Sequence, residues 1–181
     1  MRSVLSMRHA LLSVIVAVLG IAALPAQADD EPESINAFAV WTAEAAVART
    51  ADKKAVLSSA LTGTLFVETS EGPVDTGHIV CPAMVHIDLE SGRQSGNGYC
   101  TFTANDGAQA FGEWECTGVH MVGCSGTFKL TGGTERLAGV RGSSKLILRG
   151  RFHEIELHAS KTISYTVTGI ALWRDLKVET K

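Results

Sequence analysis

Apolar and polar residues alternate along most of the chain from residue 61 onward. The alternating runs are short, and turn-forming residues separate them at 71–73, 90–92, 105–107 and 132–133. A period of two is typical of strands that bury one face, and Gly, Pro, Asn and Asp at the breaks favour tight turns. The predicted strands are 61–69, 78–89, 95–104, 108–117, 123–131, 136–149, 151–158 and 161–173. Such a series indicates an all-β antiparallel sandwich or barrel.

The alanine-rich segment 35–51 lies ahead of these strands and has a mixed pattern. Alanine favours a helix, whereas Phe38 and Trp41 suit a strand. We expect an extended segment. Residues 29–60 are therefore assigned to an N-terminal arm or first strand, and residues 61–181 to a single β-barrel domain.

The alternation also assigns side chains to faces. In the second predicted strand, Cys81, Val85 and Ile87 share one face, and His86 and Asp88 lie on the other. The later strands divide in the same way. We therefore expect one apolar face directed into the protein and one polar face directed into solvent.

Residues 1–28 have the composition of a secretory signal peptide. Arg2 and Arg8 precede an apolar run at 10–24, and small residues follow it up to Ala28. The run is too short and wrongly flanked for a membrane span. We expect cleavage after Ala28 and export of the chain, to the periplasm or out of the cell.

Composition and charge narrow the classes of protein. A chain of 181 residues with 45% hydrophobic residues and 18 glycines fits one packed β domain. Loss of Arg2 and Arg8 with the leader moves the formal net charge from −3 to −5. This mildly acidic balance argues against a nucleic-acid partner.

Four cysteines, an even number, favour disulfides in an exported chain over zinc binding or a thiol nucleophile. Cross-strand partners point to the same side, so each register has to oppose apolar residues to apolar ones. This rule allows Cys81 opposite Cys100 and Cys116 directly opposite Cys124. We predict these two disulfides; a Cys100–Cys116 linkage would show that the registers are wrong. The alternative is four buried, reduced thiols.

The same registers set large side chains against glycines. The Asn-Asp-Gly loop, with its glycine at the positive-φ position, places Gly98 beside Trp114. The next hairpin then sets Trp114 against Gly126 and Gly112 against Phe128. We expect the glycine pair that follows to turn the chain.

The most specific motif of the chain lies in this second hairpin. It reads Gly-x-Phe-x-Leu-x-Gly-Gly-Thr over 126–134 and Arg-Leu-Ala-Gly-Val-x-Gly over 136–142. The motif resembles the glycine-rich hairpin of the allene oxide cyclase barrel-like proteins and, more distantly, that of dirigent proteins. Segments 96–100 and 114–116 resemble exported bacterial members of the group. The resemblance implies an eight-stranded antiparallel barrel with a narrow central cavity, although Glu135 stands where the motif commonly has glycine.

The resemblance also guides the expected function. The cyclases of this group are cofactor-free enzymes that hold a reactive lipid epoxide in an apolar cavity, and none of their functional residues aligns with this chain. We therefore expect an exported, non-enzymatic barrel without a cofactor. It would bind a small apolar molecule or serve as an envelope or secreted interaction module. The alternative is a cofactor-free cyclase or isomerase acting in the barrel cavity.

A catalytic cavity would need titratable groups that point inward. Apolar matching of the last two predicted strands brings His153 opposite Tyr165, which makes them the candidate acid–base pair. A hydrogen-bonded core histidine beside a tyrosine would give the same pattern. Glu154, Glu156 and His158 share one strand face, which we interpret as a solvated face and not as a metal site.

A basic cluster precedes that region. Lys145, Arg149 and Arg151 lie close together in the sequence. We interpret the cluster as protection for the edge of a strand or as a solubilising surface.

Overall fold

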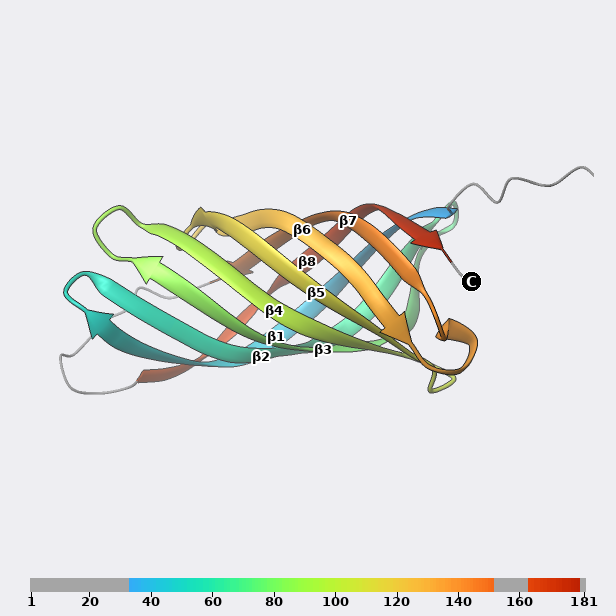
Figure 1. Cartoon of the computed structure of the whole chain (residues 1–181), viewed down its shortest axis with the longest axis horizontal. Helices are drawn as coiled ribbons and strands as arrows, with labels where there is room; N and C mark the ends of the chain where they lie inside the picture. The colour runs from blue at the N-terminus through green and yellow to red at the C-terminus, as the bar shows by residue number, and fades with distance from the viewer. Residues whose placement is uncertain (1–32, 152–162, 180–181) are drawn as a thin grey trace, which may run out of the picture. The chain divides into compact units, whose positions relative to one another are not determined.

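The structure is a computed structural model that describes residues 33–151 and 163–179. Eight antiparallel strands form one sheet that closes into a barrel, because each strand pairs with the next and β8 pairs back with β1 (Figure 1). The strands are β1 (Glu33–Ala51), β2 (Lys54–Thr69), β3 (Gly72–Asp88), β4 (Arg93–Ala104), β5 (Gln109–Val119), β6 (Gly123–Gly133), β7 (Arg141–Arg151) and β8 (Ile163–Glu179). A single turn of 3-10 helix, η1 (Glu135–Leu137), separates β6 from β7.

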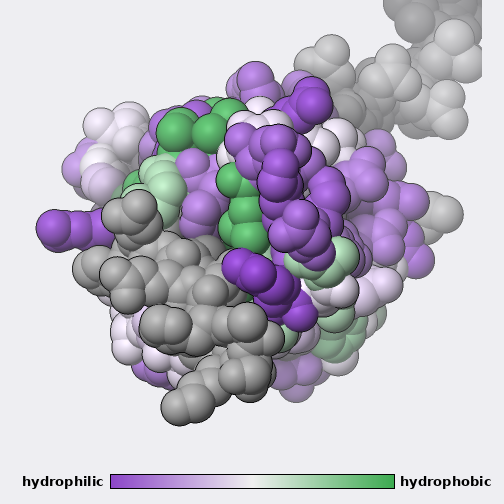
Figure 2. All heavy atoms as spheres, turned by 90° about the vertical axis from the view of Figure 1, so that its left-hand side faces the viewer, coloured by the Kyte–Doolittle hydropathy of each residue, from purple (hydrophilic) through white to green (hydrophobic). Residues whose placement is uncertain are grey.

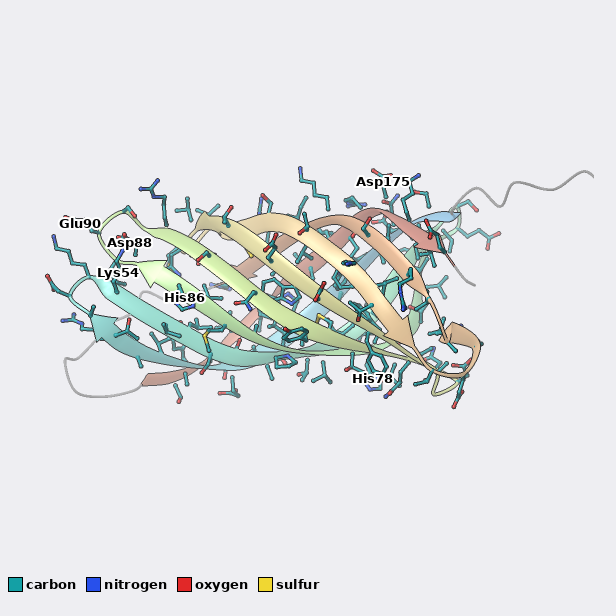
Figure 3. All side chains as sticks on the ribbon, viewed as in Figure 1. Lys54, His78, His86, Asp88, Glu90 and Asp175 are labelled. Atoms are coloured by element: carbon teal, nitrogen blue, oxygen red, sulfur yellow. A yellow bond between two sulfur atoms is a disulfide. The ribbon has the colours of Figure 1, made fainter. Side chains whose placement is uncertain are left out.

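The connections between strands alternate between the two ends of the barrel (Figure 1). The β1–β2, β3–β4 and β5–β6 turns lie at the end drawn on the left, which we call the cavity end. The β2–β3 and β4–β5 turns and η1 lie at the opposite end, which we call the aromatic end. Lys54, Asp88 and Glu90 mark the cavity end, and Asp175 lies toward the aromatic end (Figure 3).

The segment expected to be extended is a full strand of the barrel. Every second residue of β1 from Ala37 to Val47 is buried. β1 pairs with β2 along nearly its whole length, as in the partnership of Ala37 with Val67. The barrel therefore starts upstream of the boundary at residue 61, because alternate burial of small side chains overrides the helix propensity of alanine.

The connection between β6 and β7 corrects the predicted strand 136–149. The chain leaves β6 through η1 and a turn that ends at Val140, where its backbone N–H bonds to the carbonyl of Leu137 at 3.1 Å. The expected glycine turn is also wrong: Gly132 and Gly133 are the last two residues of β6. The turn instead uses Glu135, whose φ of +51° fits the left-handed region that turns require.

The predicted strand 151–158 lies, apart from Arg151, outside the described residues. The eighth strand of the barrel is supplied by the N-terminal region, since β1 and β2 together occupy the stretch before residue 70. The structure thus has the predicted number of strands, but the strands begin and end at different residues.

Two of the predicted registers are confirmed and one is wrong. Gly98 lies opposite both Ala83 and Trp114, as predicted. In the β5–β6 hairpin, however, Trp114 pairs with Phe128 and not with Gly126. The hairpin is shifted by two residues, which keeps every side chain on its predicted face.

Both predicted disulfides are present. Cys81 and Cys100 are bridged with their Cα atoms 4.1 Å apart. Because of the register shift, Cys116 lies opposite Gly126, and its bridge to Cys124 runs diagonally with a Cα separation of 5.6 Å. Two disulfides fit an oxidising, extracellular compartment.

The basic cluster lies on β7. Lys145 has a partner on both neighbouring strands, β6 and β8. Arg149 and Arg151 pair with β8 only, because the ladder between β6 and β7 ends at Leu148. Protection of a strand edge is therefore wrong for Lys145 and stays a prediction for Arg149 and Arg151.

Candidate ligand-binding cavity

The two halves of the barrel lumen are filled differently. At the aromatic end, three rings pack edge to face with centroids 5.4 to 5.8 Å apart; they belong to Phe102, Phe128 and Trp173. The ring of Phe128 covers Gly112, where a Cβ atom would overlap it. These T-shaped contacts leave this half of the lumen closely packed.

Toward the cavity end, the lumen contains a cavity of about 50 Å³. Small residues make room for it: Ala43 and Ala45 on β1, Gly123 on β6 and Gly150 on β7. The same three strands also contribute Trp41, Cys124 and Leu148. The other five strands contribute the rest of the wall, namely Leu57, Ser59, Leu61, Val85, Gln94, Trp114 and Val167. The lining is thus almost entirely apolar.

Four lining residues have side chains that can form hydrogen bonds: Ser59, Gln94, Trp41 and Trp114. Ser59 contributes a hydroxyl and Gln94 a side-chain amide, and Gln94 is only 8% exposed. Trp41 also lines the cavity, and its buried indole N–H has no hydrogen-bond partner among residues 33–151 and 163–179. A buried donor without a partner costs about 1–3 kcal/mol, and an acceptor atom on a ligand would offset that cost.

A histidine orients the amide of Gln94. His120, in the β5–β6 turn, places its Nδ1 3.3 Å from Gln94 Oε1. Partial burial lowers the pKa of His120, since desolvation penalises the charged imidazolium. Burial therefore favours the neutral form of the His120 imidazole.

The candidate acid–base pair is only half described. Tyr165 packs against the barrel core on β8, opposite Ala45 of the cavity wall. Its buried hydroxyl has no hydrogen-bond partner within the described part of the chain, and burial raises the pKa of Tyr165. His153 lies outside the described residues, as do Glu154, Glu156 and His158. The pairing of His153 with Tyr165 stays a prediction.

The charged groups of the described chain lie outside the lumen. His86, Glu113 and Glu115 are exposed, as the alternation predicts. Lys54 Nζ donates to Asp88 Oδ2 at 2.6 Å, and this hydrogen bond, together with the backbone N–H of Ser91, lowers the pKa of Asp88 well below its usual range. Within 33–151 and 163–179, no group of three or more His, Cys, Asp or Glu side chains could hold a metal ion.

The sequence did not single out the residues that shape this cavity. Gln94 stands one residue before the predicted start of its strand, so the predicted alternation does not include it. The alanines of β1 belong to the segment whose pattern was mixed. The period of two contains the signal that predicts both. Gln94 lies two residues before Gly96, so it shares the inward face of that strand. Ala43 and Ala45 lie two and four residues after Trp41 and share its face.

Comparison with models of protein families, with curated proteins and with solved structures finds no match for this chain. The similarity to the allene oxide cyclase barrel-like proteins therefore stays a prediction from the glycine-rich hairpin. In the described ranges, no helix is long and apolar enough to cross a membrane.

Proposed function

We propose that this chain is an exported, non-enzymatic barrel of the allene oxide cyclase-like type that binds a small apolar molecule at its cavity end. The observation that carries the proposal is the cavity itself, which lies in a lumen whose opposite half contains three packed aromatic rings. An apolar wall with few polar groups is the usual composition of a small-molecule site.

The size of the cavity limits the ligand. A volume of about 50 Å³ is several times the ~10–15 Å³ that one water molecule requires, and about a third of a cavity that accepts benzene. A ligand of a few non-hydrogen atoms fits, as does the apolar end of a longer molecule. Ser59, Gln94 and the indole N–H of Trp41 favour a ligand that carries one neutral hydrogen-bonding group.

A homologous series of 1-alkanols tests the proposal. Trp41 and Trp114 both line the cavity, so their fluorescence reports on binding. Each buried methylene contributes about 0.8 kcal/mol, so affinity should rise about fourfold per carbon until the cavity is full. No fluorescence change for any alkanol up to its solubility limit would refute the binding site.

Matched variants locate the site. Ala45→Leu places a larger side chain in the cavity and should abolish alkanol binding. Ala60→Leu, on the exposed face of β2, makes the same chemical change outside the barrel and should leave binding unaltered. Equal binding by both variants would place the alkanol elsewhere.

A second candidate function rests on the tyrosine. The buried hydroxyl of Tyr165, close to the cavity wall, could serve as a general acid in a cofactor-free cyclase or isomerase, with His153 as its predicted partner. Substitution of both residues by Phe separates the two functions. An enzyme would lose turnover while it stays folded, whereas a binding barrel would keep or tighten its hold on an alkanol.

A further inference from the structure

The turn between β5 and β6 presents three apolar side chains to solvent. Val119 and Met121 are each 48% exposed, and Val122 is 59% exposed. The turn is closed by a hydrogen bond from Val122 N–H to the carbonyl of Val119 at 3.1 Å, and Met121 has a φ of +71°. Turn residues are usually polar, so three exposed apolar side chains in four positions need an explanation.

His120, the residue of this turn that points inward, holds the turn against the barrel. The backbone N–H of His120 donates to the carbonyl of Gly92 at 2.8 Å, and its ring contacts Gln94. The neighbouring β3–β4 turn thus supports the β5–β6 turn. The apolar side chains are held outward at the cavity end, where Figure 2 shows hydrophobic surface among hydrophilic residues.

Basic side chains flank the apolar turn. Met121 shares a surface depression with Arg149 and Arg151 of β7. On the other side, Arg93 of β4 pairs with Val119. No ion pair found in 33–151 and 163–179 involves any of these three arginines.

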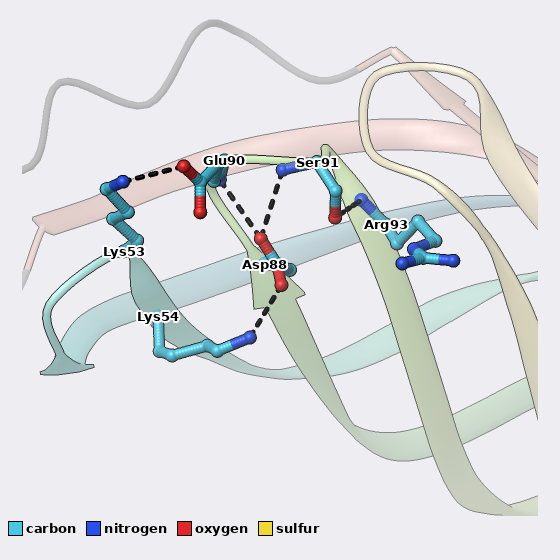
Figure 4. Close-up of polar contacts among 6 residues, drawn as sticks. All are labelled: Lys53, Lys54, Asp88, Glu90, Ser91 and Arg93. Carbon is cyan, nitrogen blue, oxygen red and sulfur yellow. Dashed lines mark hydrogen bonds and ion pairs between the residues drawn. The ribbon is translucent and has the colours of Figure 1, made fainter.

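Two acidic side chains of the neighbouring turns are paired (Figure 4), whereas no ion pair among the described residues involves Asp52 of the β1–β2 turn. Glu90 is bonded to Lys53 at 2.7 Å, and Asp88 to Lys54 at 2.6 Å. Within each pair the positive and the negative charge cancel. Arg93, Arg149 and Arg151 outnumber the one unpaired carboxylate of these turns, so this part of the described barrel has an excess of positive charge.

We propose that the cavity end docks on the surface of an anionic lipid bilayer. Val119, Met121 and Val122 would enter the boundary between headgroups and acyl chains, and Arg93 and Arg151 would face the phosphates. An apolar tip combined with cations is complementary to an anionic membrane surface, because each basic residue near that surface adds to the attraction. The inference is independent of the ligand proposed for the lumen.

Sedimentation of the full mature chain with phospholipid vesicles tests the inference. We expect binding to vesicles of equal phosphatidylglycerol and phosphatidylcholine, and little binding to phosphatidylcholine alone. Met121→Asp with Val122→Asp should lower binding more than tenfold. Val74→Asp, at a 50% exposed valine of the aromatic end, is the matched control and should change nothing.

Charge is tested separately. Arg93→Gln and Arg151→Gln should each lower affinity about fivefold at low salt. Arg149 is left intact because its guanidinium donates to the carbonyl of Leu148 at 3.0 Å. Melting temperatures show whether each variant is folded.

Three results would overturn the inference: no sedimentation with anionic vesicles, equal binding by the turn variants and the parent chain, or equal loss in Val74→Asp. If the turn binds a protein partner and not a membrane, the chain would not sediment with anionic vesicles. Ala45→Leu should bind vesicles normally, so failure of the lumen site and failure of membrane docking are distinguishable.

Discussion

The aromatic end and the cavity end of the lumen are built by the same strands and yet differ in content. At the aromatic end, the rings of Phe102, Phe128 and Trp173 fill the space between the strands. At the cavity end, the inward positions of β1 carry Ala43 and Ala45, and a cavity of about 50 Å³ remains. One half of the barrel thus serves stability, and the other half has room for a ligand.

The largest expected effect concerns the aromatic end. Phe128 is 1% exposed, and Phe128→Ala should lower the free energy of unfolding by about 3–5 kcal/mol, because it removes a buried ring and leaves a void. Phe111→Ala, on the partly exposed outer face, is the control and should change it by less than about 0.5 kcal/mol. Chemical denaturation measures both. Similar losses would show that the aromatic half is not the stabilising half.

Loss of a disulfide should come next. The bridge from Cys81 to Cys100 closes a loop with a separation of 19 residues and should contribute about 3 kcal/mol through restriction of the unfolded chain. The bridge from Cys116 to Cys124, with a separation of 8, should contribute about 2.5 kcal/mol. Denaturation of the two double-serine variants measures these values. Unchanged stability in both would mean that the bridges do not form in solution.

Small-to-large substitutions should separate the two ends most clearly. Gly112→Ala places a methyl group against the ring of Phe128 and should cost about 1–3 kcal/mol. Ala45→Val adds volume beside the cavity and should change stability by less than about 1 kcal/mol. Thermal unfolding compares them. A cost at Ala45 equal to that at Gly112 would contradict the presence of free space.

The smallest effect is a pH dependence of the cavity end. Burial lowers the pKa of His120 in the folded state, while the unfolded chain titrates near its ordinary value of 6.5. Below pH 6.5 the unfolded state therefore binds more protons, so stability should be complete above this pH and fall as the pH decreases. Melting temperatures of the parent chain and His120→Gln measure the slope. His86→Gln, on the exposed face, should keep the slope; if His120→Gln also keeps it, another group is responsible.

Much of the fold follows from residue alternation. Cys81 and Ile87 point inward and His86 points outward as predicted, and the Asn-Asp-Gly loop sets the partnership of Gly98 with Trp114. Both predictions depend only on the period of a strand and on the geometry of a short hairpin.

The β5–β6 register and the cavity could not be predicted in the same way. A shift by two residues leaves Cys116 and Cys124 on one face. The alternation of faces therefore cannot distinguish a register in which the two cysteines are direct cross-strand partners from the diagonal bridge that forms. The free volume around Ala45 depends on how strands from the whole barrel stagger around the lumen, which no local pattern records.

The binding of xenon tests the central claim most directly, because xenon enters dry apolar cavities without forming hydrogen bonds. Diffraction from crystals pressurised with xenon should show one bound atom among Ala43, Ala45 and Leu61. The aromatic end should stay empty. Xenon among Phe102, Phe128 and Trp173, or in neither half of the lumen, would contradict the division of this barrel into a packed half and a half that contains the cavity.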